Sequence, residues 1–248
     1  MKKFFQLLAK KYFWFHFRLF GKYSYLGIEQ IIRKASLVGD HPFYAKDQFP
    51  WVKDIESNWL KIRAELEEVM RNGDSIPNFL DVSPGQYRID NEPGKWKTFF
   101  LYGYGYKVEA NIARCPETAR LVEQIPGMKT AFFSILAPGK HIPPHRGPYA
   151  GVLRYHLGLI VPDPEKIRIR VHNEIGHWHE GDSLIFDDTY EHEVWNDSNG
   201  TRVVLFVDFV RPLDGFAKKL NDRIVNMISK SPLVQESIQA MEKVTERR

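Results

Sequence analysis

The chain has 248 residues but a single cysteine, Cys115, so it cannot form an intramolecular disulfide. It also lacks an internal repeat, a low-complexity tract and any uninterrupted apolar run of the roughly 20 residues that span a bilayer. These absences argue against a disulfide-stapled secreted scaffold, a solenoid and a membrane-spanning protein. What remains is a globular composition with 43% hydrophobic residues, enough for the core of one large domain. A protein without disulfides suits a reducing compartment, and we expect a cytoplasmic location.

Acidic residues are scarce at the N-terminal end. Residues 1–34 contain eight lysines and arginines interleaved with aromatic residues, and Glu29 is the single acid among them. Lys10 and Lys11 interrupt the apolar run, so we expect the segment 1–40 neither to span a membrane nor to direct export. The mixture is typical of a segment that lies on anionic lipid, here at the inner face of the membrane. Packing on its own domain or on a partner chain is the alternative, because the cations do not gather on one helical face. No nucleic-acid-binding motif accompanies the charge, so we expect no nucleic-acid partner.

Three stretches show helical spacing. Apolar residues recur at three- and four-residue steps over residues 49–70, which predicts a helix that ends at Asn72-Gly73. A further helix is expected over residues 117–124, and C-terminal helices over residues 213–248 with an interruption at Ser231-Pro232. Residues 74–110 are rich in proline and glycine around short aromatic runs, which predicts an irregular cover with short strands.

Between residues 128 and 212 the pattern changes to short runs rich in β-branched and aromatic residues. These runs are AFFSILAPG, VLRYHLGLIVP, KIRIRVH, DSLIFDD, EHEVWN and TRVVLFVDFV, and turn-forming residues separate them. Such punctuation predicts an all-β barrel or jelly roll. We therefore expect a mainly β core with flanking helices, within a single domain over residues 41–248.

Seven of the nine histidines lie between residues 141 and 192. Residues two apart on a strand share a face, so Arg154 and His156 point the same way. His145 stands at the entry to that strand and His192 just before another. Two imidazoles on neighbouring strands would suit a divalent iron with positions open for a cosubstrate and oxygen. Arg202 begins the strand RVVLFVDFV, where an inward guanidinium could hold a carboxylate through two hydrogen bonds.

The segments SILAPGKHIPPHRGPYAGVLRYHLGLIVP, GDSLIFDDTYEHEVWND and RVVLFVDFVRP resemble the aspartyl/asparaginyl β-hydroxylase family of Fe(II)- and 2-oxoglutarate-dependent dioxygenases. The resemblance is strong over residues 128–212 and weaker back to the helix at 49. It implies a double-stranded β-helix, and Fe(II), 2-oxoglutarate and O2 as cofactor and cosubstrates. The implied roles are iron ligation by His145 and His192, binding of the distal carboxylate of 2-oxoglutarate by Arg202 and Ser134, and contacts near its metal-binding end by Arg154 and His156.

Gly147 stands where most oxygenases of this superfamily carry the carboxylate that completes a facial triad. The protein-hydroxylating branch lacks that carboxylate, so the resemblance implies a position filled by water. Asp188 corresponds to an aspartate that hydrogen-bonds this water, and we assign it a catalytic role; Asp187 is less suited. Halogenases open the same position to chloride, which leaves halogenation as a further reading.

The sequence leaves the substrate open. An aspartyl or asparaginyl side chain in a peptide or amino acid is the first expectation. The alternative is the acyl chain of lipid A, because lipid A 2-hydroxylases resemble this chain in HRxPYAGxLRYHLGL, although they keep an aspartate where Gly147 stands. The basic aromatic N-terminal segment also suits a membrane-bound substrate. A jelly roll that binds without catalysis is a third reading.

For the other histidine, tryptophan and aspartate residues in this region we expect structural roles. We expect the run His177-Trp178-His179-Glu180 to form a surface turn, because Gly181-Asp182 follows it. His141 and His172 are expected in loops or at a rim. Trp195 and Asp208 are expected to serve in packing and at strand ends.

Overall fold

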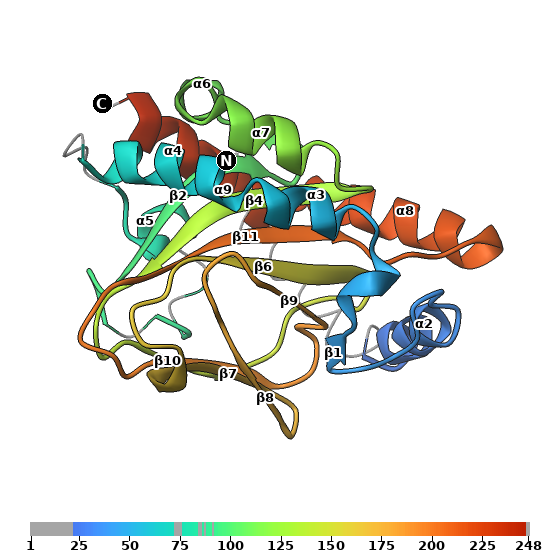
Figure 1. Ribbon diagram of the computed structural model, residues 1–248. Helices are drawn as coiled ribbons and strands as arrows, with labels where there is room; N and C mark the ends of the chain where they lie inside the picture. The colour runs from blue at the N-terminus through green and yellow to red at the C-terminus, as the bar shows by residue number, and fades with distance from the viewer. Residues whose placement is uncertain (1–21, 72–75, 84–85, 87, 91, 247–248) are drawn as a thin grey trace.

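The computed structural model describes residues 22–71, 76–83, 86, 88–90 and 92–246. Its centre is a pair of facing antiparallel sheets (Figure 1). The strands are β1 (Phe43–Tyr44), β2 (Trp96–Gly103), β3 (Tyr106–Lys107), β4 (Met128–Leu136), β5 (His141–His145), β6 (Val152–Ile160), β7 (Ile167–Val171), β8 (Glu174–His177), β9 (Ser183–Phe186), β10 (His192–Asn196) and β11 (Arg202–Val210). The larger sheet has the order β1-β9-β6-β11-β4-β2-β3, and the smaller one β5-β10-β7-β8.

Strands β4 to β11 form a double-stranded β-helix. The chain crosses repeatedly between the sheets, so that β4, β6, β9 and β11 lie in the larger sheet and β5, β7, β8 and β10 in the smaller one. The core runs from residue 128 to residue 210, which confirms the mainly β fold predicted over residues 128–212. Strand β2, over Trp96–Gly103, extends the larger sheet beyond β4 and is longer than the short strands expected there.

Helices cover the outer face of the larger sheet (Figure 1). They are α3 (Val52–Ser57), α4 (Trp59–Arg71), α6 (Glu109–Arg114) and α7 (Pro116–Val122). The single helix predicted over residues 49–70 is wrong, because the chain divides it at Asn58. The Asn58 side-chain Nδ2 donates to the carbonyl oxygen of Asp54 (2.8 Å), a local bond that competes with helix continuation.

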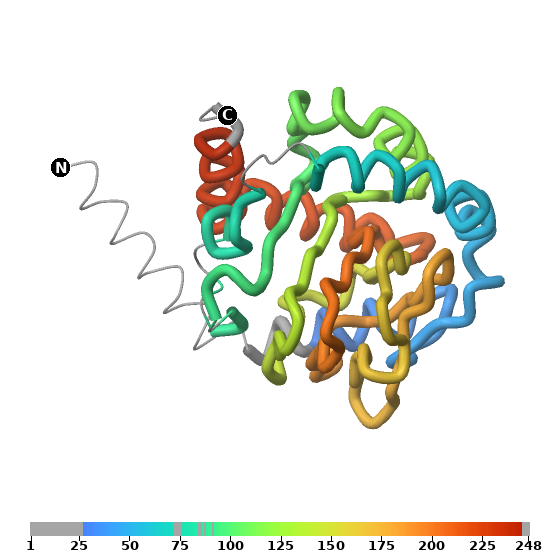
Figure 2. Tube along the Cα trace, turned by 60° about the vertical axis from the view of Figure 1, so that its left-hand side comes forward, coloured from blue at the N-terminus to red at the C-terminus, as the bar shows by residue number. Residues whose placement is uncertain are grey.

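The remaining described helices pack beside the sheets or on the inner face of the larger sheet beyond β4. They are α2 (Lys22–Lys34), the short α5 (Phe79–Val82), α8 (Gly215–Ser229) and α9 (Pro232–Glu246). The interruption expected at Ser231-Pro232 is confirmed, since α8 ends before it and α9 begins at Pro232. The turned view shows the smaller sheet, in yellow and orange, on the side opposite the cyan and green helices (Figure 2).

Alternation along the strands produces two cores. Val203, Leu205 and Val207 of β11 point outward and pack with buried residues of α3, α4 and α7. Val204 points inward, where it packs with residues of both sheets. Arg154 and His156 of β6 and Arg202 of β11 therefore face the space between the sheets, where polar side chains from several strands meet.

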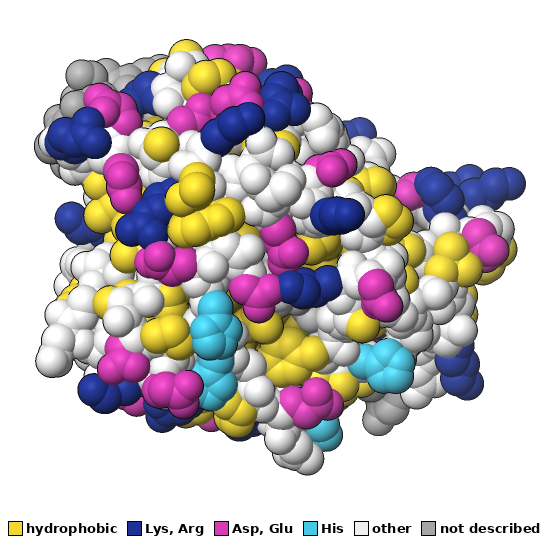
Figure 3. Space-filling model, viewed as in Figure 1, with side chains coloured by type: hydrophobic (Ala, Val, Ile, Leu, Met, Phe, Trp, Pro, Cys, Tyr) yellow, Lys and Arg dark blue, Asp and Glu magenta, His cyan; other side chains and the backbone are white. Residues whose placement is uncertain are grey.

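The described part of the N-terminal segment packs on the domain. Ile32 of α2 is fully buried against Leu213 and Ala217, and the Glu29 carboxylate accepts a hydrogen bond from the backbone N–H of Ala150 (3.1 Å). Residues 1–21, on which the lipid-surface prediction for residues 1–40 chiefly depends, lie outside the described residues. No described helix has the length and apolar character needed to cross a bilayer. On the face shown in Figure 3, basic and acidic side chains are interspersed.

Candidate active site

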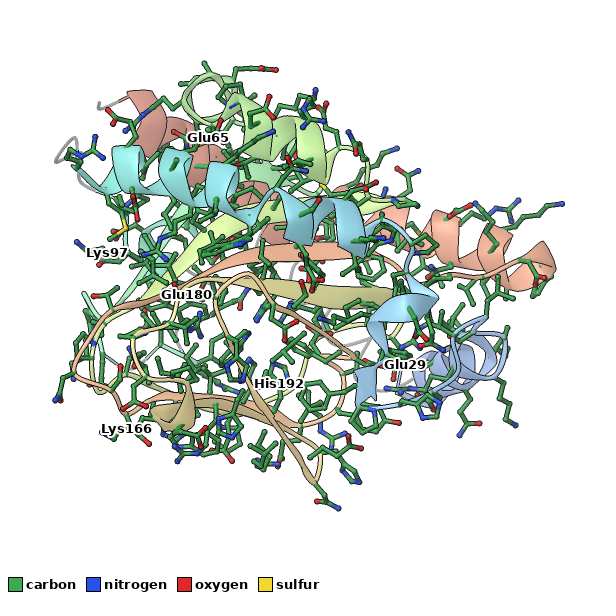
Figure 4. The ribbon with its side chains drawn as sticks, in the orientation of Figure 1. Glu29, Glu65, Lys97, Lys166, Glu180 and His192 are labelled. Atoms are coloured by element: carbon green, nitrogen blue, oxygen red, sulfur yellow. The ribbon has the colours of Figure 1, made fainter. Side chains whose placement is uncertain are left out.

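His145 and His192 face each other across neighbouring strands of the smaller sheet. They are register partners in the β5-β10 pair, and their ring centroids lie 4.1 Å apart. The ring of His192 lies between the two sheets (Figure 4). His145 Nδ1 lies 2.8 Å from the carbonyl oxygen of Pro143, and His192 Nδ1 lies 3.0 Å from that of Tyr190. A carbonyl only accepts, so each Nδ1 carries the proton and each Nε2 keeps a lone pair, as metal-binding histidines require.

Burial is the main reason that these imidazoles stay neutral. Burial lowers the pKa of His145 to about 4, with a smaller contribution from the Arg154 cation, while its hydrogen bond to Pro143 opposes the change. Burial and the neighbouring His145 hold the pKa of His192 well below its ordinary value. A neutral imidazole is the form that binds a metal, because a proton on Nε2 would compete for the lone pair. Across the residues that the structure describes, no group of three or more His, Cys, Asp or Glu side chains is arranged around a common metal position.

The Asp188 carboxylate occupies the space beside Gly147. A Cβ atom at Gly147 would come within 2.1–2.2 Å of all three carboxylate atoms of Asp188. The Gly147 N–H also donates to the backbone carbonyl of Asp188 (2.7 Å). Glycine is therefore required here by close packing, and the acidic group that a triad would place on this residue comes instead from the loop before β10.

Arg154 holds that carboxylate in place. Its Nη2 lies 2.8 Å from Asp188 Oδ2, and its Nε donates to Asp208 Oδ1 (2.9 Å). Burial raises the pKa of the Asp188 carboxyl to about 7, although the Arg154 charge acts in the opposite direction. The structure thus brings Arg154 and Asp188 together as expected of one site. The guanidinium is already engaged by two carboxylates, so its contact with 2-oxoglutarate stays a prediction.

Arg202 lies at the other end of the space between the sheets and has no counterion among the described residues. The residue is 1% exposed, and its guanidinium carbon lies 4.6 Å from the ring centroid of Trp178. Its Nε and Nη1 have no hydrogen-bond partner, and burial alone lowers its pKa to about 9. A buried cation of this kind is costly unless a carboxylate pairs with it.

Further polar atoms around Arg202 are also left without partners. Both ring nitrogens of His156 and the indole Nε1 of Trp178 are buried and unpaired. Ser134 Oγ accepts a hydrogen bond from Trp96 Nε1 (3.1 Å), so its own proton remains available for donation. The burial of His156 and the nearby Arg154 and Arg202 hold its pKa well below the ordinary value. These groups fit a small dicarboxylate that reaches from Arg202 toward the histidine pair.

Comparison with known proteins shows the family of this chain. The family model described as aspartyl/asparaginyl beta-hydroxylase matches residues 56–212. The chain belongs to this family. An ornithine lipid ester-linked acyl 2-hydroxylase from Rhizobium tropici is 50% identical over 211 residues, which are 85% of this chain and 75% of that protein. The human aspartyl/asparaginyl beta-hydroxylase is 39% identical over 166 residues, which are 65% of this chain and only 21% of that protein. A cupin domain from Enterobacter cloacae superposes on 48% of this chain and 99% of its own, with 14% identity and a TM-score of 0.34.

Sequence reasoning missed three residues of the candidate site in this hydroxylase-family chain. Trp178 is fully buried beneath Arg202, which corrects its assignment to a surface turn, whereas His179 beside it is exposed as expected. Asp208, assigned to a strand end, is the second carboxylate on Arg154. Tyr104 adopts a left-handed backbone conformation (φ 49°), and burial, Asp208 and Asp188 raise the pKa of its hydroxyl.

His141 and His172 are peripheral. His141 stacks on Trp195 at 5.2 Å and contacts Glu193 (3.0 Å) on the outer side of the smaller sheet. His172 is exposed in the turn between β7 and β8. Trp195 is therefore a packing residue, as expected.

Proposed function

We propose that the protein is an Fe(II)- and 2-oxoglutarate-dependent hydroxylase that acts on a C–H bond in the acyl chain of an amphipathic lipid. The observation that carries this proposal is the cross-strand pair of His145 and His192, with both Nδ1 atoms bonded to carbonyls and both Nε2 atoms left as donors to a metal. The unpaired, buried Arg202 supports the cosubstrate assignment.

Bound iron, with 2-oxoglutarate and O2, would supply the oxidant that a saturated C–H bond requires. His145 and His192 would hold the metal. Arg202, together with the Ser134 hydroxyl, would receive the distal carboxylate of 2-oxoglutarate, which would pair the buried cation. His156 would donate from one ring nitrogen to the other end of the same molecule.

Asp188 would act where the family's triad carboxylate is missing. Its carboxylate fills the space beside Gly147 and is fixed by Arg154. From there it would accept a hydrogen bond from water at the open metal position and so orient that water. The packed interior around Trp178 and Phe186 excludes bulk water, which would otherwise quench the oxidant.

Two observations favour an acyl chain over the aspartyl or asparaginyl side chain that the sequence placed first. The relative at 50% identity is named as an ester-linked acyl 2-hydroxylase, whereas the aspartyl/asparaginyl hydroxylase is 39% identical over a shorter stretch. The apolar ring of Phe206 adjoins the site, 4.9 Å from the His156 ring and 4.2 Å from the Arg154 guanidinium. The aspartyl-type substrate is the second candidate, and Arg154 is the cation that would bind it, but Asp188 and Asp208 already neutralise that cation.

The test is hydroxylation by the purified protein with Fe(II) and 2-oxoglutarate. Ornithine lipid, lipid A and an aspartyl peptide are compared by succinate release and by the gain of one oxygen in the product. We expect turnover on an acyl lipid, and loss of both iron binding and turnover in His145→Ala and His192→Ala. His141→Ala is the matched control, because that imidazole lies outside the site. Full turnover in either ligand variant would overturn the metal assignment, and a chloride-dependent halogenated product would show halogenation instead.

A further inference from the structure

Helix α8 and the C-terminal end of α2 expose several large apolar side chains. Eight large hydrophobic residues are exposed in the described part of the chain, and four of them lie on these two helices or in the turn after α2, namely Ile31, Leu37, Phe216 and Met227. Phe216 at 74% and Met227 at 65% are the most exposed of the eight. The two helices pack together at one edge of the molecule, where Ile32 is buried with Leu213 and Ala217 (Figure 1). Exposed apolar groups that gather in this way are typical of an interaction surface.

Basic side chains line the same face of α8. Five exposed residues recur along the helix and its C-cap at steps of three and four and form one stripe, here called the α8 stripe: Phe216, Lys219, Arg223, Met227 and Lys230. Asp222 is the single acidic residue of α8, lies outside the stripe and is paired with Lys218 (2.6 Å). The α8 stripe therefore combines apolar side chains with three cations, and the helix contributes no acid to it.

The opposite side of α8 holds the loop that follows His145. Asn221 is fully buried, where it accepts a hydrogen bond from the Tyr149 hydroxyl (2.7 Å) and donates one to the carbonyl oxygen of Gly151 (3.0 Å). A Cβ atom at Gly151 would come within 1.9 Å of Asn221 Oδ1, so helix and loop are in direct contact. The helix that carries the stripe therefore also positions the loop beside the candidate active site.

We infer that the α8 stripe docks on an anionic lipid surface and thereby places the candidate active site at the bilayer that contains the lipid substrate. The inference rests on the proposed function for the identity of that substrate, but the docking itself is independent of turnover. Phe216 and Met227 enter the boundary between headgroups and acyl chains, and the three cations of the stripe contact the lipid phosphates. Because α8 also positions the loop after His145, the helix that binds the membrane holds the site next to it.

Charge disfavours two other occupants of the α8 stripe. Residues 1–21, which precede α2, contain five lysines and arginines and no acidic residue, so they would meet the stripe with charge of the same sign. A second copy of the chain related by two-fold symmetry would place the same cations opposite one another. An anionic bilayer supplies both an apolar interior and the negative charge that the stripe attracts.

The test is binding of the full chain to vesicles, measured by co-sedimentation over a range of lipid concentrations. Vesicles of phosphatidylcholine alone are compared with vesicles of equimolar phosphatidylcholine and phosphatidylglycerol. Lys219→Gln/Arg223→Gln removes two charges from the stripe, and Phe216→Ser removes its most exposed apolar group. Lys53→Gln/Lys61→Gln and Leu60→Ser are the matched controls, because these exposed residues lie on α3 and α4, which cover the outer face of the larger sheet. Thermal melting confirms that each variant is folded.

We expect wild type to bind the anionic vesicles more tightly than the neutral ones. The double charge variant should lose about 25-fold in affinity for the anionic vesicles, since each cation near such a surface contributes about fivefold. Phe216→Ser should lose about tenfold, and both controls should bind as wild type does. Stripe variants that bind as tightly as the controls would overturn the docking surface. Sedimentation equilibrium that shows a wild-type dimer and monomeric stripe variants would assign the face to a second copy of the chain instead.

Turnover separates this inference from the proposed function. On ornithine lipid in anionic vesicles, the stripe variants should lose kcat/KM in proportion to their lost affinity, whereas on the same lipid in neutral detergent micelles they should match wild type. Vesicle binding that depends on the stripe, without hydroxylation of any lipid, would overturn the proposed substrate but not the docking surface. Hydroxylation of lipid in micelles, with vesicle binding unchanged in the stripe variants, would overturn the docking surface but not the proposed function.

Discussion

Arg202 makes the ligand-free protein less stable, and its replacement should therefore stabilise the fold. A pKa lowered from 12.5 to about 9 corresponds to a penalty on the charged form of about 5 kcal/mol. The penalty is fully present at every pH below about 9, because the guanidinium is charged in both the folded and unfolded protein there. Loss of the contact with Trp178 offsets about 2 kcal/mol of the gain. We expect Arg202→Met to raise the free energy of unfolding by about 1–3 kcal/mol.

The same substitution should abolish the response to 2-oxoglutarate. With Fe(II) and without O2, a concentration 100 times Kd stabilises a one-site protein by about 2.7 kcal/mol, and we expect this gain in wild type and its absence in Arg202→Met. Urea denaturation with and without the ligand measures both effects. Arg168→Met is the control, because Arg168 also lies 4.6 Å from an indole ring, that of Trp195, but is half-exposed and paired with Asp197. That control should change stability by about 0.5 kcal/mol at most. The reasoning fails if Arg202→Met is the less stable protein or if 2-oxoglutarate still stabilises it.

Two further predictions concern the metal position. Because burial lowers the pKa of His145 to about 4, metal binding should persist as the pH falls past 6.5 and be lost only as the pH approaches about 4. Titration of Co(II) absorbance against pH measures this binding. Loss of binding near pH 6.5 would contradict the neutral imidazole assigned here. Gly147→Ala should cost about 1–3 kcal/mol and most of the activity, because its Cβ displaces the Asp188 carboxylate. In an Asp188→Gly background the stability cost should nearly vanish, and an unchanged cost in urea denaturation would show that the two residues do not compete for space.

The sequence predicts the β-helix well because local sequence features mark each of its strands. Short β-rich runs separated by Gly, Pro, Asn and Asp mark each strand, and the order of the motifs around His145, His192 and Arg202 predicts the candidate site. The strand register places the two histidines opposite each other, and the alternation of apolar and polar residues along each strand does not reveal this register. The break at Asn58 was missed for a related reason, since apolar periodicity continues through it while one side-chain hydrogen bond ends the helix.

Trp178 and Asp208 show that a sequence pattern does not predict contacts between distant segments. The run GHWHEG has the composition of a turn, yet Trp178 is buried in the core between the sheets, with Arg202, at the start of β11, over its ring. Asp208 follows an apolar run and ends near a strand terminus, yet its register partner in β6 is Arg154. A cross-strand partner can be known only once strand order is known. Here β6 and β11 are neighbours in space although 41 residues lie between Ile160, the end of one, and Arg202, the start of the other.

The adjacent aspartates of the loop before β10 divide two tasks that one residue could not perform. Asp187 is fully buried and bonded to Arg211, and Arg33 of α2 also reaches it (3.0 Å). With Asp187 neutralised by these cations, the loop is anchored to the core and to the N-terminal helix, and Asp188 is left to fill the space beside Gly147. A carboxylate held through a loop and Arg154 would stay near the proposed metal position without a direct bond to it. The glycine, the paired aspartates and the arginines on both sides are therefore parts of one arrangement, which would keep negative charge beside the proposed metal position while a coordination position stays open.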